Sequence, residues 1–509
     1  MSDRRLAALL SFGVGLLSLS QEILWMRMLG FAQQGHPQVF GLVLGAFLLG
    51  VSGGAFWGKG LCQRTRDLRP LARHQLLLAT GMDLLTLVLL PALLQPEPQA
   101  LTAVLLLIAL CAAAKASLFP LVHQLGSRGS EQSTDLGRSL SGIYLLNVCG
   151  SALGPLLTGY VLLDRLSAES AFAGVALGTA LLALVCGGAR APGVLLLGLA
   201  GWAMSAPPPA LRAVAQNVGL GERGPLLQNR HGIVHTSDDP LGEIVYGGNA
   251  YDGRFVLDMA NNSNGLDRAY LMAVLHPRPR RVLLIGLGGG AWLGAIAGLP
   301  GIEHIDVVEL NPAYLQLMAE RPAVAAALRD PRVRVQVDDG RRWLRRRPEL
   351  RYDLVFSNTS FHWRSHVGLL LSQEFMQLVR ARMAPGGILA FNTTGSLDAL
   401  YTAQQNFAHA LRYRNFAFAS DLPLRRQPGA EALLRGARLG GQGAFGDALF
   451  APGRVGHRLL HEPLQAAQTL TDGKAVRLIR DDDPVNEYRH GQAPLLGALD
   501  RWLPDRPEP

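Results

Sequence analysis

VLLIGLGGGAWLG, residues Val282–Gly294, is the stretch that decides the fold of the second half of this 509-residue chain. An apolar run leads into Gly286, Gly288, Gly289 and Gly290, and a helix is predicted to begin directly after them. Glycine is needed where a backbone turns tightly and approaches a bound nucleotide closely. Tight packing of the turn would explain the same glycines, so the strands that follow must decide between the two interpretations.

Acidic residues stand at the ends of the next two predicted strands. The strand 304–309 ends at Glu309, about twenty residues after the glycines, where an acid can accept hydrogen bonds from both ribose hydroxyls. The strand 333–337 runs into Asp338 and Asp339, which are placed to meet the amino group of an adenine. Because parallel strands end in one crevice, the pattern predicts an adenosine-bearing cofactor. The predicted cofactor-binding residues are Gly286, Gly288, Gly289, Gly290, Glu309, Asp338 and Asp339.

Strands and helices alternate along residues 266–455, which predicts a Rossmann-like α/β domain with a parallel sheet and helices on both faces. Short strand-like segments separated by Gly, Asn and Asp turns precede it and predict a small antiparallel β subdomain over 226–265. Residues 456–509 form a tail that is harder to interpret. The predicted strands of the parallel sheet are Arg281–Ile285, His304–Glu309, Val333–Val337, Asp353–Ser357 and Gly387–Asn392.

Residues 1–205 are dominated by Leu, Ala, Gly and Val and are predicted to form a multi-span α-helical membrane domain. A bilayer span needs about 20 mostly apolar residues. A seventh segment, Gly193–Met204, is short and fits a half-span, an interfacial helix or a tilted full span. A proline run within the linker 206–225 closes this domain. The six predicted spans are Leu6–Leu24, Val39–Leu61, Gln75–Leu94, Leu101–Val122, Leu140–Leu163 and Ala168–Gly187.

Pairs of small residues recur four apart in these spans, as at Gly41/Gly45 and Gly50/Gly54, and such pairs let helices approach closely in lipid. Lys and Arg gather in the loop between the second and third spans, and the neighbouring loops carry none. The positive-inside rule therefore predicts a cytoplasmic N-terminus. Six spans would place the second half of the chain in the cytoplasm, and seven would place it outside.

The net charge of +9 comes partly from these loops and partly from RRWLRRR, Arg341–Arg347. We interpret that stretch as a solvated basic helix face near an anionic membrane and predict no nucleic-acid partner. The four cysteines lie in or beside the spans without a CxxC pair, so neither a disulfide framework nor a zinc site is indicated. The pairs His362/His366 and His231/His235 lack the glutamate of an HExxH motif, and we predict no metal site.

The glycine loop, Glu309, Asp338-Asp339 and the Tyr352-Asp353 strand together resemble spermidine synthases and, more broadly, class I S-adenosylmethionine-dependent methyltransferases. The β subdomain followed by DRAYLMAVLHP is similar to the N-terminal part of spermidine synthase, with Tyr270 at a comparable place. This resemblance implies transfer of an aminopropyl group from decarboxylated S-adenosylmethionine to a polyamine. The resemblance does not decide whether two copies of the chain form a homodimer.

The first half carries a resemblance as well. SLSQEILWMRMLG (Ser18–Gly30) and GIYLLNVCGSALGPLLTGYVLL (Gly142–Leu163) look like the membrane region of fused membrane and spermidine synthase-like proteins. The closing motif DDDPVNEY is similar to the C-terminal motif of that group. Because both candidate cofactors are made in the cytoplasm, we expect a multi-pass protein of the inner (plasma) membrane with a cytoplasmic catalytic domain.

The sequence departs from the resemblance where the chemistry is expected. Spermidine synthases carry an Asp after the glycine triplet, and Ala291 stands there. They carry another Asp at the end of the fourth strand and one more three residues on, and Asn358 and Phe361 stand at these places. A carboxylate binds an ammonium group and takes its proton, whereas an amide accepts a hydrogen bond without useful basicity. Ala291 and Asn358 favour alkyl or methyl transfer to an acceptor other than a polyamine.

The predicted catalytic residues are Asn358, which would align a nucleophile by a hydrogen bond, and His362, as a general base. Tyr270, Phe361 and Trp363 are predicted to bind the acceptor, because aromatic faces hold a cation without a carboxylate. Packing of the loop onto the sheet would account for the aromatic residues equally well. The acids Asp482, Asp483 and Glu487 would return negative charge to the pocket if the tail folds over it.

Three functions therefore compete. The first is a membrane-anchored spermidine synthase-like transferase that uses S-adenosylmethionine or its decarboxylated form. The second is an S-adenosylmethionine-dependent methyltransferase. The third is a membrane transport or sensor protein with a non-catalytic nucleotide-binding domain, which a polar path through Glu22, Asp83, Lys115 and Asn147 would favour.

Overall fold

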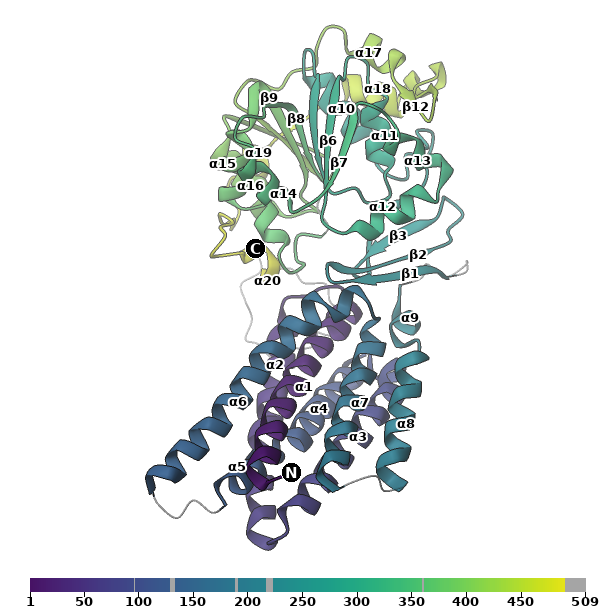
Figure 1. Ribbon diagram of the computed structural model, residues 1–509. Helices are drawn as coiled ribbons and strands as arrows, with labels where there is room; N and C mark the ends of the chain where they lie inside the picture. The colour runs from purple at the N-terminus through teal and green to yellow at the C-terminus, as the bar shows by residue number, and fades with distance from the viewer. Residues whose placement is uncertain (96, 129–132, 188–190, 217–222, 359–360, 490–509) are drawn as a thin grey trace. The chain divides into compact units, whose positions relative to one another are not determined.

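The computed structural model of the chain describes residues 1–95, 97–128, 133–187, 191–216, 223–358 and 361–489. They divide into two compact units. The first comprises Met1–Ala215 with Gln228–Arg230, and the second begins at His231 and includes the described residues of Gln216–Leu227. Figure 1 shows a helical first unit and a second unit built around a twisted sheet.

The first unit is a helical bundle. Six of its described segments are long and apolar enough to cross a membrane, and each overlaps one predicted span. One of them, Gln99–Ser127, is formed by two consecutive helices that meet at Ser117. The helices of this unit are α1 (Asp3–Ala32), α2 (Gln38–Arg64), α3 (Leu68–Leu93), α4 (Pro98–Ala116), α5 (Leu118–Ser127), α6 (Ser133–Tyr160), η1 (Leu162–Asp164), α7 (Ala168–Gly187), α8 (Ala191–Ser205) and α9 (Ala210–Val214).

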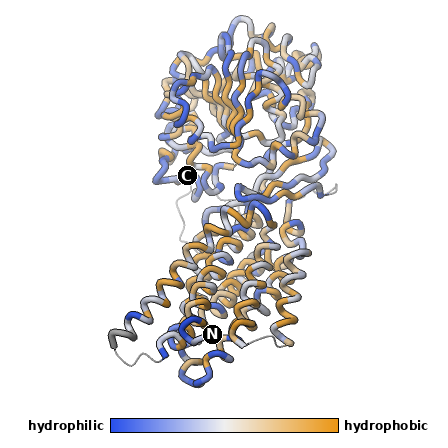
Figure 2. The backbone as a smooth tube through the Cα atoms, viewed as in Figure 1, coloured by the Kyte–Doolittle hydropathy of each residue, from blue (hydrophilic) through white to orange (hydrophobic). Residues whose placement is uncertain are grey.

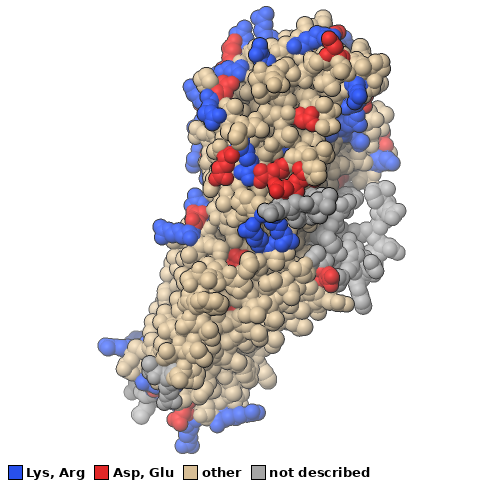
Figure 3. Space-filling view, turned by 90° about the vertical axis from the view of Figure 1, so that its right-hand side faces the viewer, with Lys and Arg blue, Asp and Glu red and all other residues tan. Residues whose placement is uncertain are grey.

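The outer surface of the bundle is apolar. The helices are mostly hydrophobic along their length (Figure 2), and the body of the unit shows few charged side chains (Figure 3). Leu49 and Phe56 of α2 are 75% and 79% exposed, and Trp202 of α8 is 66% exposed. An apolar surface of this kind is costly in water and favourable in lipid.

Glycines bring α2 into close contact with α4. A Cβ atom at Gly54 would overlap the carbonyl oxygen of Ala113, and Gly50 lies equally close to the same helix one turn earlier. The prediction for this pair is therefore confirmed. Gly41 and Gly45 have no atom within 4 Å of where a Cβ would stand, so they do not form the predicted contact.

Two of the ionisable side chains inside the bundle, Lys115 and Asp83, are paired with each other. The Lys115 ammonium on α4 donates to both carboxylate oxygens of Asp83 on α3, at 2.7 and 2.6 Å, and to the Gln21 amide oxygen on α1 at 2.8 Å. Lys115 is 1% exposed and Asp83 is fully buried. Asn147 donates to the Ser11 carbonyl at 2.9 Å. These bonds tie helices together and do not favour a polar path for transport.

The β subdomain of the second unit is a four-stranded sheet in the order β1-β2-β3-β4. Its last hairpin turns through Gly248 and Asn249, both with positive φ, so β4 begins directly after the turn. Only Gly253 and Arg254 of the strand-like segment Gly253–Met259 (GRFVLDM) belong to this strand, and the residues after them form no strand. The strands are β1 (Arg223–Asn229), β2 (Gly232–Ser237), β3 (Ile244–Gly247) and β4 (Ala250–Arg254).

The main sheet has eight strands in the order β14-β10-β11-β9-β8-β5-β6-β7. The five strands from β9 to β7 are parallel, as predicted, and β11, β10 and β14 extend the sheet in antiparallel fashion. Chain order reverses between β5 and β8, and open sheets of this kind bind ligands at that point. The strands are β5 (Arg281–Ile285), β6 (His304–Glu309), β7 (Val333–Val337), β8 (Tyr352–Ser357), β9 (Met383–Asn392), β10 (His409–Tyr413), β11 (Phe416–Ser420) and β14 (Gln465–Ala466), with a separate hairpin β12 (Arg438–Leu439) and β13 (Gln442–Gly443).

Helices cover both faces of the main sheet (Figure 1). One face packs on α10–α13, α17 and α18, and the other packs on α14, α15, α16 and α19. Two separate hydrophobic cores result, one on each face. The helices are α10 (Asp267–Leu275), α11 (Ala291–Ala297), α12 (Pro312–Ala319), α13 (Pro322–Leu328), α14 (Gly340–Arg346), η2 (Val367–Leu370), α15 (Gln373–Arg380), α16 (Leu397–Asn406), α17 (Ala430–Gly436), η3 (Asp447–Phe450), α18 (Val455–His461), α19 (Ala467–Thr471) and α20 (Val485–Arg489).

Candidate functional site

The glycine loop joins β5 to α11 at the point where chain order reverses. Gly286, Gly288 and Gly290 have φ values of 85°, 52° and 75°, which favour glycine over any other residue. Gly288 and Gly289 also make room for β4, because a Cβ at Gly288 would lie 2.6 Å from the Asp252 carbonyl oxygen. The packing interpretation therefore applies to Gly288 and Gly289, and the nucleotide-binding interpretation of the loop stays a prediction.

Glu309 stands at the end of β6 with its carboxylate turned back to the glycine loop. One oxygen accepts a hydrogen bond from the Leu287 N–H at 2.7 Å, and the other accepts one from the Asn311 N–H at 2.8 Å. The side chain is 5% exposed, and its burial raises the pKa of Glu309 to about 7. The Leu310 N–H also interacts with this carboxylate, and since a carboxylate can accept about four hydrogen bonds, capacity remains for a hydroxyl group.

The two acids after β7 have local partners. Asp339 caps α14 by accepting from the Arg342 N–H at 2.8 Å. Asp338 accepts from the Asp339 N–H at 2.7 Å and pairs with the Arg342 guanidinium. Asp338 and Asp339 therefore lie at the carboxyl edge of the sheet, beside the strand that ends in Glu309.

A cavity of about 470 Å³ opens beside the glycine loop, between the β subdomain and the carboxyl ends of β8 and β9. Gly289 and Ala291 line it from the glycine loop and α11, and Asn358 lines it from the end of β8. Its wall combines aromatic rings with many amide side chains. The lining residues are Tyr251, Asp252, Gly253, Asn262, Ser263, Asn264, Gly265, Arg268, Gly289, Ala291, Trp292, Asn358, Phe361, Asn392, Thr394, Asn415 and Phe416.

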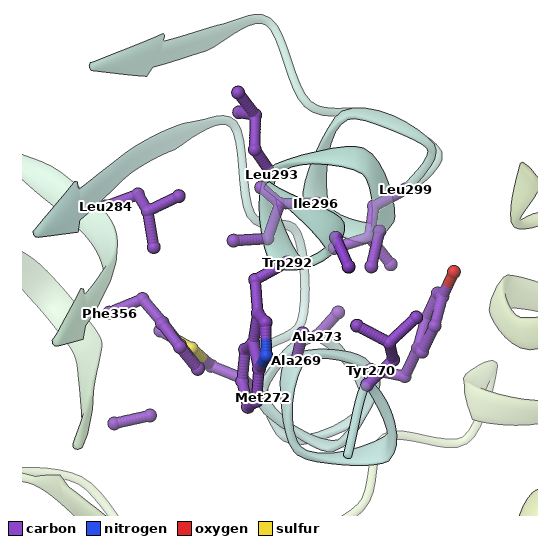
Figure 4. Packing of buried hydrophobic residues seen from close by; sticks show 14 of the residues in the cluster. Ala269, Tyr270, Met272, Ala273, Leu284, Trp292, Leu293, Ile296, Leu299 and Phe356 are labelled. Carbon is purple, nitrogen blue, oxygen red and sulfur yellow. The ribbon is translucent and has the colours of Figure 1, made fainter. Parts of the chain in front are cut away.

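Trp292 builds one side of this cavity. Its ring stacks on Phe416 at a centroid distance of 5.1 Å and packs at 4.4 Å from Phe356. The indole N–H donates to the Asn264 carbonyl at 3.1 Å, which fixes the loop that forms the opposite rim. Figure 4 shows Trp292 lying between Phe356 and the residues of α10. Trp292 therefore makes this wall rigid and apolar.

The amides that line the cavity differ in how far they are already bonded. Asn264 accepts from the Arg254 N–H at 2.8 Å, and Asn415 donates to the Asn392 amide oxygen at 2.8 Å and accepts from Arg268. Their carboxamides hold the frame of the cavity. The side chain of Asn358 makes no hydrogen bond with any residue in the described part of the chain, so its amide is available to a ligand.

Asp252 is the single acid among the lining residues, and the sequence did not point to it. Its carboxylate accepts a hydrogen bond from the Tyr314 hydroxyl of α12, and Arg364 contributes a nearby positive charge. Burial raises the pKa of Asp252 to about 6. It reaches the cavity because β4 packs on the glycine loop, which is a tertiary contact that strand patterning does not reveal.

The segment after β8 brings only one of its aromatic residues to the cavity. Phe361 lines the cavity and stacks on Trp363 at a centroid distance of 5.7 Å, and Trp363 itself is buried and not among the lining residues. His362 is also buried, and its Nδ1 lies 2.7 Å from the hydroxyl of Thr394. His362 therefore does not line the cavity itself but contacts Thr394, which does.

Residues near the C-terminus fold over this segment. Asn486 donates to the His362 carbonyl at 2.6 Å, and Glu487 accepts from the Gly368 N–H at 2.9 Å. Asp481 pairs with the buried Arg341, so part of the basic stretch on α14 has a structural role. Asp482, Asp483 and Glu487 are not among the lining residues. The tail therefore positions the loop and does not add charge to the cavity.

Tyr270 does not reach the cavity. Its side chain is fully buried on α10, and its ring meets Phe445 edge to face at a centroid distance of 4.9 Å. The adjacent Asp267 accepts from the Tyr413 hydroxyl at 2.9 Å and from Arg268 at 2.7 Å. The structure thus assigns Tyr270 to the hydrophobic core, and we do not retain it as an acceptor-binding residue.

A mainly parallel sheet, a bent glycine loop and a buried acid at the end of the adjacent strand define the class of Rossmann-like nucleotide-binding proteins. Within that class, residues 269–414 match the family described as "Spermine/spermidine synthase domain". Over these residues the second unit is similar to spermidine synthases.

Curated relatives carry related names. The chain is 29% identical over 323 residues to "Polyamine aminopropyltransferase" of Mycobacterium tuberculosis, covering 58% of this chain and 60% of that protein. It is 35% identical over 169 residues to "Polyamine aminopropyltransferase 2" of Streptomyces coelicolor, covering 31% of this chain and 30% of that protein. It is 29% identical over 157 residues to "Spermidine synthase 2" of Hyoscyamus niger, covering 29% of this chain and 50% of that protein.

Among solved structures, a spermidine synthase in complex with the transition-state analogue AdoDATO matches with a TM-score of 0.34 and 14% identity, over 55% of this chain and 87% of that one. Human methyltransferase-like protein 13 in complex with SAH matches with a TM-score of 0.28 and 20% identity, over 35% of this chain and 92% of that one.

Proposed function

We propose that the second unit transfers an aminopropyl group from decarboxylated S-adenosylmethionine to an amine, and that the first unit holds it in a lipid bilayer. One observation carries the proposal. The bent glycine loop is bonded to the buried carboxylate of Glu309 and, through Gly289, forms part of the wall of the cavity. A nucleoside held by Glu309 would thus present its reactive chain to that cavity. The relatives named as polyamine aminopropyltransferases support the same reaction.

The residues at the sheet edge fit an adenosyl sulfonium. Glu309 retains acceptor capacity for a ribose hydroxyl after its bonds to Leu287, Leu310 and Asn311. The left-handed conformations of Gly286 and Gly288 let the loop turn tightly at the end of β5, where the donor is expected. Asp339 and Asp338 would lie on the adenine side, as the order of strand ends implies.

Asn358 would align the acceptor. Its amide oxygen accepts a hydrogen bond from one N–H of the acceptor, so the nitrogen lone pair can point at the donor carbon. The new C–N bond forms as the C–S bond breaks, and the sulfur leaves as a neutral thioether that needs no acid. The proton of the product ammonium passes to water. Alignment is therefore the main contribution that the protein makes to this step.

A second function is methyl transfer from intact S-adenosylmethionine. Ala291 and Asn358 favour it, because they remove carboxylates that would hold the amine of an aminopropyl chain and the amine of a polyamine. The two reactions leave different nucleoside products.

Identification of those products tests the proposal. The purified full-length protein in detergent is incubated with each donor and a panel of amines, and the nucleosides are separated by chromatography. We expect methylthioadenosine from the decarboxylated donor, dependent on the amine and lost in Glu309→Gln. Formation of S-adenosylhomocysteine alone would replace aminopropyl transfer by methyl transfer, and formation of neither would reject both.

The membrane assignment has a test of its own. Six described segments fit spans, which with a cytoplasmic N-terminus would place the second unit in the cytoplasm. We expect a reporter fused after Pro209 to be active only on the cytoplasmic side. A reporter active only outside would mean that α8 also crosses the bilayer.

A further inference from the structure

The charges that face the cavity leave little net negative charge for a ligand. Asp252 is the one carboxylate among the lining residues, and it already accepts from Tyr314 and lies near Arg364. Arg268 is the one lining cation, and it pairs with Asp267 at 2.7 Å. A ligand with two ammonium groups would therefore meet one partly compensated carboxylate and one guanidinium.

A dicationic diamine is poorly suited to such a cavity. Moving an ammonium group out of water is expensive unless a carboxylate or strong acceptors replace the water. The positions where acids would face the acceptor are Ala291, Asn358 and Phe361, and all three line this cavity. Most of the remaining amides are committed to the frame, as the Asn392–Asn415 hydrogen bond shows. The second ammonium of a diamine would find only Asp252 as an anionic partner among the described lining residues, and that carboxylate already accepts from Tyr314 and lies near Arg364.

The same wall suits one amine with an apolar substituent. Tyr251, Trp292, Phe361 and Phe416 present aromatic surface, and two of these rings stack directly on each other. Aromatic walls bury apolar groups and also attract a single positive charge. Asn358 supplies one hydrogen-bond acceptor for the amine itself. The cavity thus offers one polar anchor and a broad apolar surface.

We propose that the acceptor is a primary amine with a single nitrogen and an apolar substituent, and not a diamine or polyamine. This inference rests on the proposed transfer to an amine and specifies its substrate class. The neutral amine forms the N–C bond, the C–S bond of the donor breaks, the thioether leaves, and the extra proton of the product goes to water.

The test compares two acceptors on the full-length protein in detergent, with whichever donor it consumes. Phenethylamine represents the proposed class and 1,4-diaminobutane represents the diamines. We expect kcat/KM to be at least about tenfold higher for phenethylamine, which corresponds to about 1.4 kcal/mol of transition-state discrimination. An equal or higher value for the diamine would overturn the inference.

Asn358→Asp provides the sharper comparison, because it restores an acid at the end of β8 on a side chain without internal bonds. It should raise kcat/KM for the diamine and so lower the ratio of kcat/KM for phenethylamine to kcat/KM for the diamine. Gln377→Glu adds the same charge at an exposed position of α15 outside the cavity and should leave the ratio unchanged. Equal effects of the two variants would also overturn the inference.

Calorimetric binding of methylthioadenosine separates this inference from the proposed function. Binding of the nucleoside together with preference for the diamine would reject the acceptor class alone. If the nucleoside and both donors fail to bind, the proposed function fails and the acceptor class fails with it.

Discussion

Substitution of Glu309 by glutamine is the perturbation whose effect can be worked most directly from the structure. Each carboxylate oxygen of Glu309 already receives one backbone N–H, from Leu287 or Asn311. Glutamine keeps one oxygen and turns an NH₂ group toward the other N–H, so one ribose hydroxyl loses its anionic acceptor. A hydrogen bond to a charged group contributes about 1.5–3 kcal/mol. We therefore expect the Kd of methylthioadenosine to rise about 10- to 150-fold.

Isothermal titration calorimetry of the detergent-purified protein measures this change. Asp306→Asn is the matched control, because Asp306 is a buried acid on the same strand whose carboxylate bonds to Tyr352 at 2.8 Å and His304 at 3.0 Å. The control should leave the Kd unchanged. If Glu309→Gln binds the nucleoside as tightly as the natural protein, the assignment of Glu309 to the ribose is refuted.

The pH dependence gives an independent check on the same residue. Burial raises the pKa of Glu309 to about 7, so the carboxylate gains a proton and loses acceptor capacity as pH falls from 8 to 6. We expect affinity for methylthioadenosine to fall over that range, and to fall less in Glu309→Gln. Because an ordinary glutamate titrates near about 4.3, the unfolded chain binds fewer protons than the folded chain between that value and 7. Glu309 therefore makes the free energy of unfolding decrease as pH rises through this window, and Glu309→Gln should reduce that slope.

Three further predictions concern other parts of the chain. Gly54→Leu should lower the thermal midpoint of the detergent-solubilised protein by several degrees, because the larger side chain separates α2 from α4. Gly53→Leu, at a position with open space around it, should leave the midpoint unchanged. Equal effects of the two substitutions would contradict the described packing of α2 on α4. Lys115→Met leaves the buried Asp83 carboxylate without its cation and should lower the free energy of unfolding by about 3–5 kcal/mol. The thermal midpoint should fall accordingly. An unchanged midpoint would show that the pair does not stabilise the protein. Asn486→Ala removes the hydrogen bond to the His362 carbonyl, which positions the loop that carries the lining residue Phe361. KM for the amine should therefore rise while the Kd of the donor stays constant. An equal loss of donor affinity would indicate general unfolding instead.

The parallel core of the second unit could be predicted because short strand-like runs alternate with helical segments, and because β5 ends before Gly286 and β6 ends at Glu309. Each of the five predicted strands overlaps an observed one, and β5, β6 and β7 have the predicted bounds. The β subdomain was predicted less well. Its last hairpin depends on two left-handed residues, Gly248 and Asn249, and the apolar residues beyond them pack on helices without forming a strand.

Candidate site residues at strand ends were predictable for the same reason. The end of β6 places Glu309, and the end of β8 places Asn358, because side chains at the carboxyl ends of parallel strands share one edge. Asp252 was not predictable in this way, since it comes from another sheet and reaches the cavity through packing. Tyr270 was misassigned because α10 is apolar on nearly every side, so its pattern does not tell which face meets a cavity.

The contacts that the C-terminal segment makes could not be predicted from its sequence. DDDPVNEY suggests charge, but the structure uses Asp481 to hold Arg341 and Asn486 to hold the loop after β8. Asn486 and His362 are more than 120 positions apart in the chain, and only the folded structure brings them together.

The central claim is that the second unit binds an adenosyl sulfonium for transfer of its alkyl chain. Side-by-side calorimetric titration of the full-length protein with S-adenosylmethionine and its decarboxylated form tests it most directly. The account predicts binding of the decarboxylated form, weakened in Glu309→Gln and unchanged in Asp306→Asn. Binding of neither form would contradict it.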